Sequence, residues 1–323
     1  HLQRAAARRT PAGGRSPDVR LSRPLPPDPK AAMDHVGRLS VELLEQYQIP
    51  PENLCAVSVS TAGTVDYKTG RLKYSSQSPA WGTDVPLVSY LQPYFAPNTM
   101  IFLENAGKMT ARPFLLEKDL AGKRVLVIFA CWGLSSCLIE KGRILGGKNS
   151  LIGEIGHMII DPSDPETCGC GSHGCLERLV SVDRVRSILQ QQAAHFPGSS
   201  LLQSDPEQIT IPQVFAASSQ EDPLARYLVD YLARAFAAAL RNISLVFDPD
   251  LIVFQGDYAW ADPYFDQRLR GILREFQYFP PEGPFEIHYD QRPLAEMDVL
   301  GSYTALTRRY FATPALYQES DPG

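Results

Sequence analysis

The sequence predicts an α/β fold for this chain of 323 residues, on three observations. Short apolar runs have the length of buried strands, and longer segments with apolar residues at helical spacing alternate with them. The strand-like run at 54–60 ends in a loop of small residues, which is typical of sheets that bind ligands at the carboxyl ends of their strands. The third observation is a dense group of cysteine and histidine residues between 157 and 175, which indicates a metal site in the same fold.

The elements expected in the N-terminal part are, in order, a helix at 29–48, a strand at 54–60, a turn between short strands at 66–70, a helix near 86–94 and a strand at 99–104. Asp28 and Pro29 favour the start of the first helix, because proline fits the first turn of a helix. The loop Thr61-Ala62-Gly63 follows the first strand directly. It is therefore expected at the carboxyl end of that strand, where open α/β sheets place their ligands.

The C-terminal part is expected to begin with a β-hairpin, in which strands 125–130 and 134–140 are joined by Cys131-Trp132-Gly133. The remaining elements are, in order, a turn at 141–143, the cysteine-rich loop, a long helix at 222–247, a strand at 251–254 that ends at Gln255-Gly256-Asp257, a helix at 263–276, a strand at 285–288 and a last helix at 297–311. The residues after Ala312 are expected to form a tail.

Composition and charge limit the classes of function. The net charge is −5, which argues against nucleic-acid binding by the bulk of the chain. The first thirty residues are rich in Arg, Pro and Gly and predict a solvated tail, with contact to phosphates or to a membrane as the alternative. The sequence shows no signal-peptide core and no apolar run of about 20 residues, so we expect a cytoplasmic location and no membrane partner.

A metal site is predicted by His157, Cys168, Cys170 and Cys175. The alternative is that these cysteines are buried as small apolar residues and that the histidine belongs to the core, as is usual for scattered cysteines. Three of the six cysteines fall within one short segment with glycines between them, which favours a metal. Zinc prefers four tetrahedral nitrogen and sulfur ligands, and four protein ligands leave no position for water, so we expect a structural zinc.

At residues 153–177 the sequence reads GEIGH, ten residues and CGCGSHGCLE, and it closely resembles the ROK family of bacterial sugar kinases and sugar-responsive repressors. Further motifs occur in the order of the family: STAGTVD, SPAW before VPL, LEN, EKGRILGG and IVFQGD. The resemblance covers roughly residues 25–312. It implies the α/β, two-lobed, actin-like ATPase (ribonuclease H-like) fold of that family, with a zinc-stapled loop.

The resemblance also implies how the chain divides. The expected parts are an Arg/Pro-rich tail at 1–24, an N-terminal lobe at 25–120 completed by the helix at 297–312, a C-terminal lobe with the zinc loop at 121–296, and a tail at 313–323. Kinases of this fold open with an Asp-x-Gly-Gly-Thr hairpin, which is absent from residues 1–60. We therefore expect an incomplete N-terminal lobe, and the first residue, His1 rather than Met, predicts that upstream sequence is absent.

Carried over residue by residue, the resemblance implies a sugar site. Glu154 and Glu177, on both sides of the metal ligands, match acidic residues that bind sugar hydroxyls, with solvated surface carboxylates as the alternative. His157 would serve twice, with one ring nitrogen on zinc and the other toward the sugar. Asn105 matches a further sugar-binding position, and Gly63 matches a position where the backbone approaches the ligand.

The sequence departs from the family kinases on the ATP side. The family places its general base, an Asp, directly after Glu-Asn, and Ala106 stands there in this chain; a methyl group cannot accept a proton. The family's Gly-Thr-Gly phosphate turn is replaced by Cys131-Trp132-Gly133, and the opening phosphate hairpin is absent. These differences predict that the chain has no catalytic residue, transfers no phosphoryl group and binds no ATP.

The predicted function is the non-catalytic, effector-sensing body of a ROK-type transcriptional regulator that binds a sugar or a sugar phosphate. A homodimer is implied by the resemblance alone, and DNA would be bound only through an upstream winged helix-turn-helix that this chain does not contain. Two alternatives remain open. One is an ATP-dependent hexose kinase, glucokinase-like or acting on N-acylhexosamines, and the other is a decayed relative kept for protein contacts.

Overall fold

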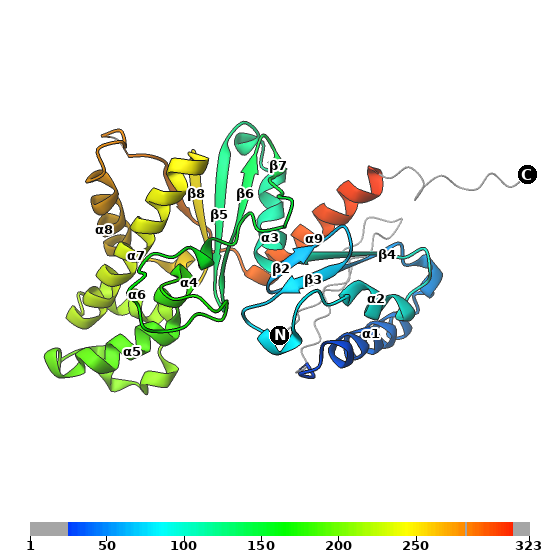
Figure 1. Cartoon of the computed structure of the whole chain (residues 1–323), viewed down its shortest axis with the longest axis horizontal. Coiled ribbons are helices and arrows are strands. Elements are labelled where there is room, and N and C mark those ends of the chain that lie inside the picture. Colours follow the sequence, from blue (N-terminus) through cyan, green and yellow to red (C-terminus); the bar gives the residue numbers. More distant parts are fainter. Residues whose placement is uncertain (1–24, 282, 313–323) are drawn as a thin grey trace, which may run out of the picture. The chain divides into compact units, whose positions relative to one another are not determined.

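The computed structural model of the chain describes residues 25–281 and 283–312 (Figure 1). The predicted tails at 1–24 and 313–323 lie outside the described residues. The described chain forms two compact units. Unit 1 contains residues 25–116, 148–150 and 293–312, and unit 2 contains the remainder.

Unit 1 contains two small sheets and the helices that pack on them. Its strands are β1 (Ala56–Thr61), which pairs in parallel with β4 (Met100–Asn105), and β2 (Thr64–Asp66), which pairs antiparallel with β3 (Arg71–Tyr74). Its helices are α1 (Pro29–Gln46), α2 (Leu87–Leu91), α3 (Ala106–Ala111) and α9 (Leu294–Phe311). The side chain of Asp28 accepts a hydrogen bond from the Ala31 N–H and caps α1, as the sequence predicts.

The core of unit 1 joins α1 and α2 to the strands. Buried side chains of α1, β1, β3, α2 and β4 form one apolar cluster, which includes Met33, Val59, Leu72, Leu87 and Leu103. Helix α9 packs on α3 so closely that a Cβ at Gly301 would lie 1.9 Å from the Met109 carbonyl oxygen. Only glycine fits this approach of two helix backbones.

Unit 2 is organised around a five-stranded sheet with the order β7-β6-β5-β8-β9. The strands are β5 (Arg124–Ala130), β6 (Leu134–Glu140), β7 (Arg143–Ile144), β8 (Leu251–Gly256) and β9 (Glu286–Tyr289). Strands β5, β8 and β9 are parallel, and β6 and β7 continue the sheet antiparallel. Strands β5 and β8 are buried along almost their whole length, as parallel strands covered on both faces must be.

The helices of unit 2 pack around α7 (Pro223–Phe247), which is seen beside β8 in Figure 1. The others are α4 (Leu176–Leu179), α5 (Val182–Gln192), α6 (Ile211–Ser219) and α8 (Pro263–Arg274). Helix α7 contacts all of them. Its Phe236 packs edge-on against Phe254 of β8 and Phe265 of α8, within one apolar core that spans the sheet and the helices.

The predicted α/β class is confirmed, and most predicted elements occur within a few residues of their expected bounds. Three differ. The last helix begins at Leu294 rather than at 297, directly after Pro293. The helix expected near 86–94 is α2 followed by a 3₁₀ turn at Gln92–Tyr94, and the strand expected at 251–254 continues to Gly256 because it pairs with β5 up to that residue.

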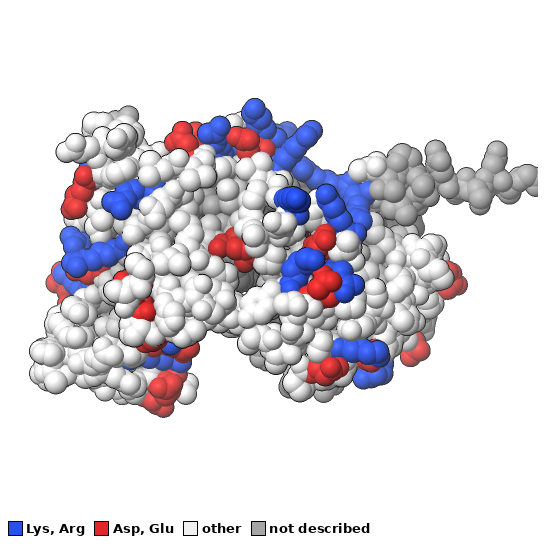
Figure 2. Space-filling model, in the orientation of Figure 1, with Lys and Arg blue, Asp and Glu red and all other residues white. Residues whose placement is uncertain are grey.

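Charged side chains of both signs lie next to one another on the surfaces that Figure 2 shows. Ion pairs account for part of this mixing, for example Arg71 with Asp84 in unit 1 and Arg124 with Glu140 in unit 2. Among the helices of residues 25–281 and 283–312, none combines the length and the apolar character that crossing a membrane requires.

Candidate metal centre and its surroundings

The structure brings His157, Cys168, Cys170 and Cys175 together in unit 2, with all their ligand atoms within 4.8 Å of one another. His157 Nδ1 lies 3.6 Å from Cys168 Sγ, and Cys170 Sγ lies 3.6 Å from Cys175 Sγ. A tetrahedron with Zn–S bonds of about 2.3 Å has edges of about 3.8 Å between its sulfurs. The geometry and the donor set of one nitrogen and three sulfurs therefore fit a structural zinc.

The burial of the cysteines also bears on metal binding. Burial raises the pKa of the Cys168 thiol and of the Cys175 thiol. A coordinated divalent cation stabilises the thiolate and reverses this preference, because it supplies the opposite charge inside the site. The protons of these thiols are therefore expected to leave as the metal binds.

The loop that carries the ligands closes at Gly174. This residue has φ +67°, and a Cβ there would lie 1.7 Å from the Asp161 carbonyl oxygen, so glycine is required. The Ile160 N–H donates to the Gly174 carbonyl at 2.8 Å, and the Leu176 N–H donates to the Met158 carbonyl at 2.9 Å. These bonds bring the residues after His157 next to those around Cys175.

His157 sits in a 3₁₀ turn, Ile155–His157, in which its N–H donates to the Glu154 carbonyl at 3.1 Å. The turn directs Nδ1 toward the cysteines. With Nδ1 on a metal, Nε2 carries the ring proton and is the nitrogen that can donate to a second partner. The role predicted for this histidine toward the sugar stays a prediction.

Glu177 lies on α4, two residues after the last cysteine ligand, and its Oε2 accepts a hydrogen bond from the Leu134 N–H at 2.7 Å. Leu134 is the first residue of β6. A Cβ at Gly156 would lie 2.2 Å from the Leu134 carbonyl oxygen and 3.2 Å from Glu177 Cβ. The 3₁₀ turn of His157, the start of β6 and Glu177 are thus packed on one another.

In unit 1, the structure brings together the other two residues that were predicted to bind sugar. Asn105 is 4% exposed; its Nδ2 donates to the Gly63 carbonyl at 2.9 Å, and its Oδ1 accepts from the Lys108 N–H and caps α3. Gly63 has φ +103°, and a Cβ there would lie 2.3 Å from the Tyr74 carbonyl oxygen. Close backbone packing inside unit 1 therefore already requires glycine at 63, and its approach to a ligand stays a prediction.

Ala106 is the first residue of α3 and directly follows Asn105. The preceding acid, Glu104, is buried, and its two carboxylate oxygens accept hydrogen bonds from Arg112 Nη2 at 2.7 Å and from the Asn105 N–H at 3.1 Å. Both oxygens of this carboxylate are therefore engaged by groups of unit 1 itself.

The turn at 131–133, where the resemblance predicts that a phosphate loop has been lost, lies at the carboxyl ends of β5 and β8. Cys131 Sγ is 4.0 Å from Asp257 Oδ1, and Trp132 is 65% exposed. Burial, and then the charge of Asp257, raises the pKa of the Cys131 thiol to about 12, and burial raises the pKa of Asp257. A neutral thiol beside a carboxyl group offers a phosphate no positive charge.

Sequence reasoning did not find the contacts that surround these residues. The bond from Leu134 to Glu177 joins residues 43 positions apart. Gly156 is part of the GEIGH motif, so its presence was a signal, but the carbonyl that it makes room for could not be named. A buried ion pair beside the metal loop, Asp164 with Arg184, was also missed because neither residue belongs to a motif.

The fold and the metal centre define an α/β protein with a His-Cys₃ site in a glycine-rich loop beside a central sheet. The family model described as the ROK family matches residues 21–291. The chain belongs to the ROK family, as its motifs predict.

Relatives of both functional kinds are similar to this chain. A glucokinase of Thermotoga maritima is 26% identical over 288 residues, which cover 85% of this chain and 86% of that protein. The N-acetylglucosamine repressor of Escherichia coli O157:H7 is 26% identical over 243 residues, which cover 74% of this chain and 57% of the repressor.

Solved structures show the same fold. A ROK family transcriptional regulator, a homologue of the E. coli MLC protein, has a TM-score of 0.73 at 20% identity, over 93% of this chain and 76% of that one. A ROK family glucokinase from Streptomyces griseus, solved with glucose and AMPPNP, has a TM-score of 0.73 at 20% identity, over 95% and 96% of the two chains. The actin-like fold of the ROK family is thereby confirmed.

Proposed function

We propose that this chain is the effector-sensing body of a ROK-type bacterial transcriptional regulator, which binds a sugar or a sugar phosphate and does not transfer phosphate. One contrast carries the proposal. The residues assigned to the sugar are retained, and Glu177 among them packs beside the turn of His157, whereas Ala106 replaces the residue that would activate the sugar hydroxyl.

The sugar contacts are assigned to Glu154, His157, Glu177, Asn105 and Gly63. Carboxylates accept hydrogen bonds from vicinal hydroxyls, and a metal-stapled loop fixes them at low entropic cost. Glu177 is held beside the metal loop by the hydrogen bond that its Oε2 accepts from the Leu134 N–H. The Asn105 amide is held in one orientation by its bonds with the Gly63 carbonyl and the Lys108 N–H.

The absence of phosphoryl transfer is supported by three features of the described chain. Ala106 has no proton acceptor, and Glu104 is held by Arg112 and the Asn105 N–H. In the turn at 131–133, the side chains of Cys131 and Trp132 occupy positions where a phosphate cradle offers glycine N–H groups and a hydroxyl. The neighbouring Asp257 would add charge repulsion toward the oxygens of a phosphate.

Calorimetry with a panel of hexoses, N-acetylhexosamines and their 6-phosphates tests the sensing role. We expect one class to bind the native protein, and Glu154→Gln and Glu177→Gln to weaken that binding about 10-fold or more, because each removes a charged acceptor. Glu207→Gln is the matched control, since Glu207 is an exposed acid of unit 2 outside the metal loop. If no sugar gave a measurable heat of binding, the result would favour the alternative that the chain has lost ligand binding and is kept for protein contacts.

The alternative is a hexose kinase, and the similarity to a glucokinase over 86% of that enzyme favours it. A coupled assay with ATP, magnesium and the same hexoses decides between the two. Turnover above background that disappears on Glu154→Ala would establish the kinase. We expect no turnover for the native chain and none for Ala106→Asp, because the restored base would still lack the phosphate turn.

The regulatory part of the proposal needs a DNA-binding domain in addition to this body. The match to the N-acetylglucosamine repressor covers 57% of that protein, which leaves room for one there. Translation of the genomic sequence upstream, in frame, tests this for the present protein. A winged helix-turn-helix in that reading supports the regulator, and sedimentation of the purified chain tests the proposed homodimer.

A further inference from the structure

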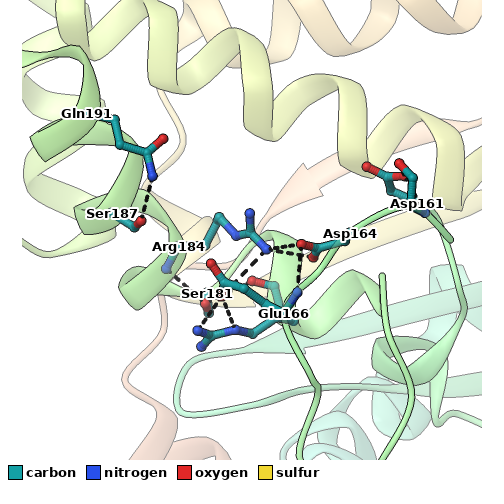
Figure 3. Close-up of polar contacts among 9 residues, drawn as sticks. Asp161, Asp164, Glu166, Ser181, Arg184, Ser187 and Gln191 are labelled. Atoms are coloured by element: carbon teal, nitrogen blue, oxygen red, sulfur yellow. Dashed lines mark hydrogen bonds and ion pairs between the residues drawn. The ribbon is translucent and has the colours of Figure 1, made fainter.

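The segment between His157 and Cys168 forms a buried ion pair with α5 through Asp164 and Arg184, which the proposed function does not use. The Asp164 side chain is 2% exposed, and Arg184 Nη2 lies 2.6 Å from each of its carboxylate oxygens. The Glu166 N–H also donates to Asp164 at 3.3 Å. Figure 3 shows Arg184 extending from α5 toward Asp164 and Glu166. The middle of the metal loop is therefore tied to the helix that follows the loop.

A second tie involves the neighbouring acid. Glu166 accepts a hydrogen bond from Arg178 Nε at 2.7 Å and lies 3.6 Å from Arg184. Arg178 directly follows Glu177 on α4. Ser181 joins the two short helices, because its hydroxyl donates to the Arg178 carbonyl and accepts from the Arg184 N–H. The loop, α4 and α5 thus meet in one polar cluster (Figure 3).

This arrangement is an inefficient way to stabilise a fold. The cost of removing two charges from water offsets most of the attraction between them, and a well-packed apolar pair often gives equal or greater stability. Arg184 carries an added cost, since its Nε is buried and has no hydrogen-bond partner among the described residues. Unlike an apolar pair, a hydrogen-bonded ion pair fixes the orientation of its two groups relative to each other.

We propose that Arg184 is a positioning residue for the metal centre. By holding Asp164, it fixes the middle of the segment whose two ends carry His157 and the cysteines. Without this contact, the middle of the segment would be less ordered before the metal binds, and metal binding would have to offset a larger loss of conformational entropy. The tie keeps the four ligand atoms near the spacing that zinc requires before the metal arrives.

The experiment measures zinc affinity of the purified full chain by competition with a chromophoric chelator, in the absence of sugar. We expect Arg184→Met to weaken zinc binding about 10-fold or more, in the range seen when groups that support metal ligands are removed. The matched control is Arg292→Met. Arg292 holds the similarly buried Asp290 at 2.7 Å, and Asp290 contacts Gln255 and Phe254 rather than the metal loop.

The control is expected to lower the melting temperature and leave zinc affinity unchanged. A double variant, Asp164→Leu with Arg184→Met, leaves no orphaned charge and covers the case in which the single variant does not fold. We expect it to melt near the native temperature and still bind zinc more weakly. Native zinc affinity in either folded variant would overturn the proposal and leave the pair a purely stabilising role. Because no sugar is present, the result does not depend on the proposed function.

Discussion

Asp298 is a residue whose chemistry depends on its surroundings in unit 1. It lies on α9, partly buried beside the Ser60 hydroxyl of β1. Burial raises the pKa of this carboxyl to about 6, and the hydrogen bond with Ser60 counteracts part of the effect. The sequence places Asp298 in an amphipathic helix, but only the packing of α9 against β1 shows that the carboxyl is desolvated.

Asp298→Asn is therefore expected to change how stability depends on pH. The folded protein holds the Asp298 proton more tightly than the unfolded chain, so the free energy of unfolding falls as pH rises from about 4 to about 6 and stays lower above that. The variant should be about 1–2 kcal/mol more stable than the native protein at pH 7 and equal to it near pH 4. Thermal melts of both proteins at the two pH values measure this. An equal difference at both pH values would contradict the shifted pKa.

The metal loop shows, at the scale of one element, how two similar glycines differ. Gly171 and Gly174 both have positive φ, at +88° and +67°. A Cβ at Gly171 meets nothing within 4 Å, whereas a Cβ at Gly174 would lie 1.7 Å from the Asp161 carbonyl oxygen. The motif alone predicts that the backbone requires glycine at both positions. The structure shows that a side chain at Gly171 would cause conformational strain only, whereas one at Gly174 would also clash with the Asp161 carbonyl.

Alanine at these two positions should separate the effects. Gly171→Ala is expected to cost about 1 kcal/mol of stability through strain alone, and to retain the metal. Gly174→Ala must displace the backbone at Asp161 and is expected to prevent closure of the loop and to lose the metal. Metal content by atomic absorption, together with thermal melts, checks both. Full metal content in Gly174→Ala would show that the loop can close by another route.

The hairpin of β5 and β6 is an element that the sequence predicted well, because both strands are mostly apolar and the turn between them contains glycine. Its role beside the metal loop was not predictable. The Leu134 N–H at the start of β6 reaches Glu177 only because the turn at Gly156 packs on the Leu134 carbonyl. A backbone donor carries no sequence signature, since every residue except proline has one.

For the whole molecule, removal of zinc is the most informative perturbation. A structural metal contributes its binding free energy to folding, and this loop supplies all four ligands within unit 2. We expect a strong chelator to lower the melting temperature and to abolish sugar binding, because Glu154 and Glu177 flank the ligands. Calorimetry before and after verified metal removal measures both. Unchanged melting of metal-free protein would show that the loop does not depend on zinc.

The sequence by itself determined most strands, the longer helices, the four residues of the candidate metal centre and the family, because these depend on local periodicity and on the spacing of motifs along the chain. Only the tertiary structure decided that Arg184 holds Asp164, that Leu134 holds Glu177 and that Gly63 packs on Tyr74. Each of these contacts joins segments that are separate in sequence. Such contacts form only when the elements pack together, so no single segment of the sequence contains the information that specifies them.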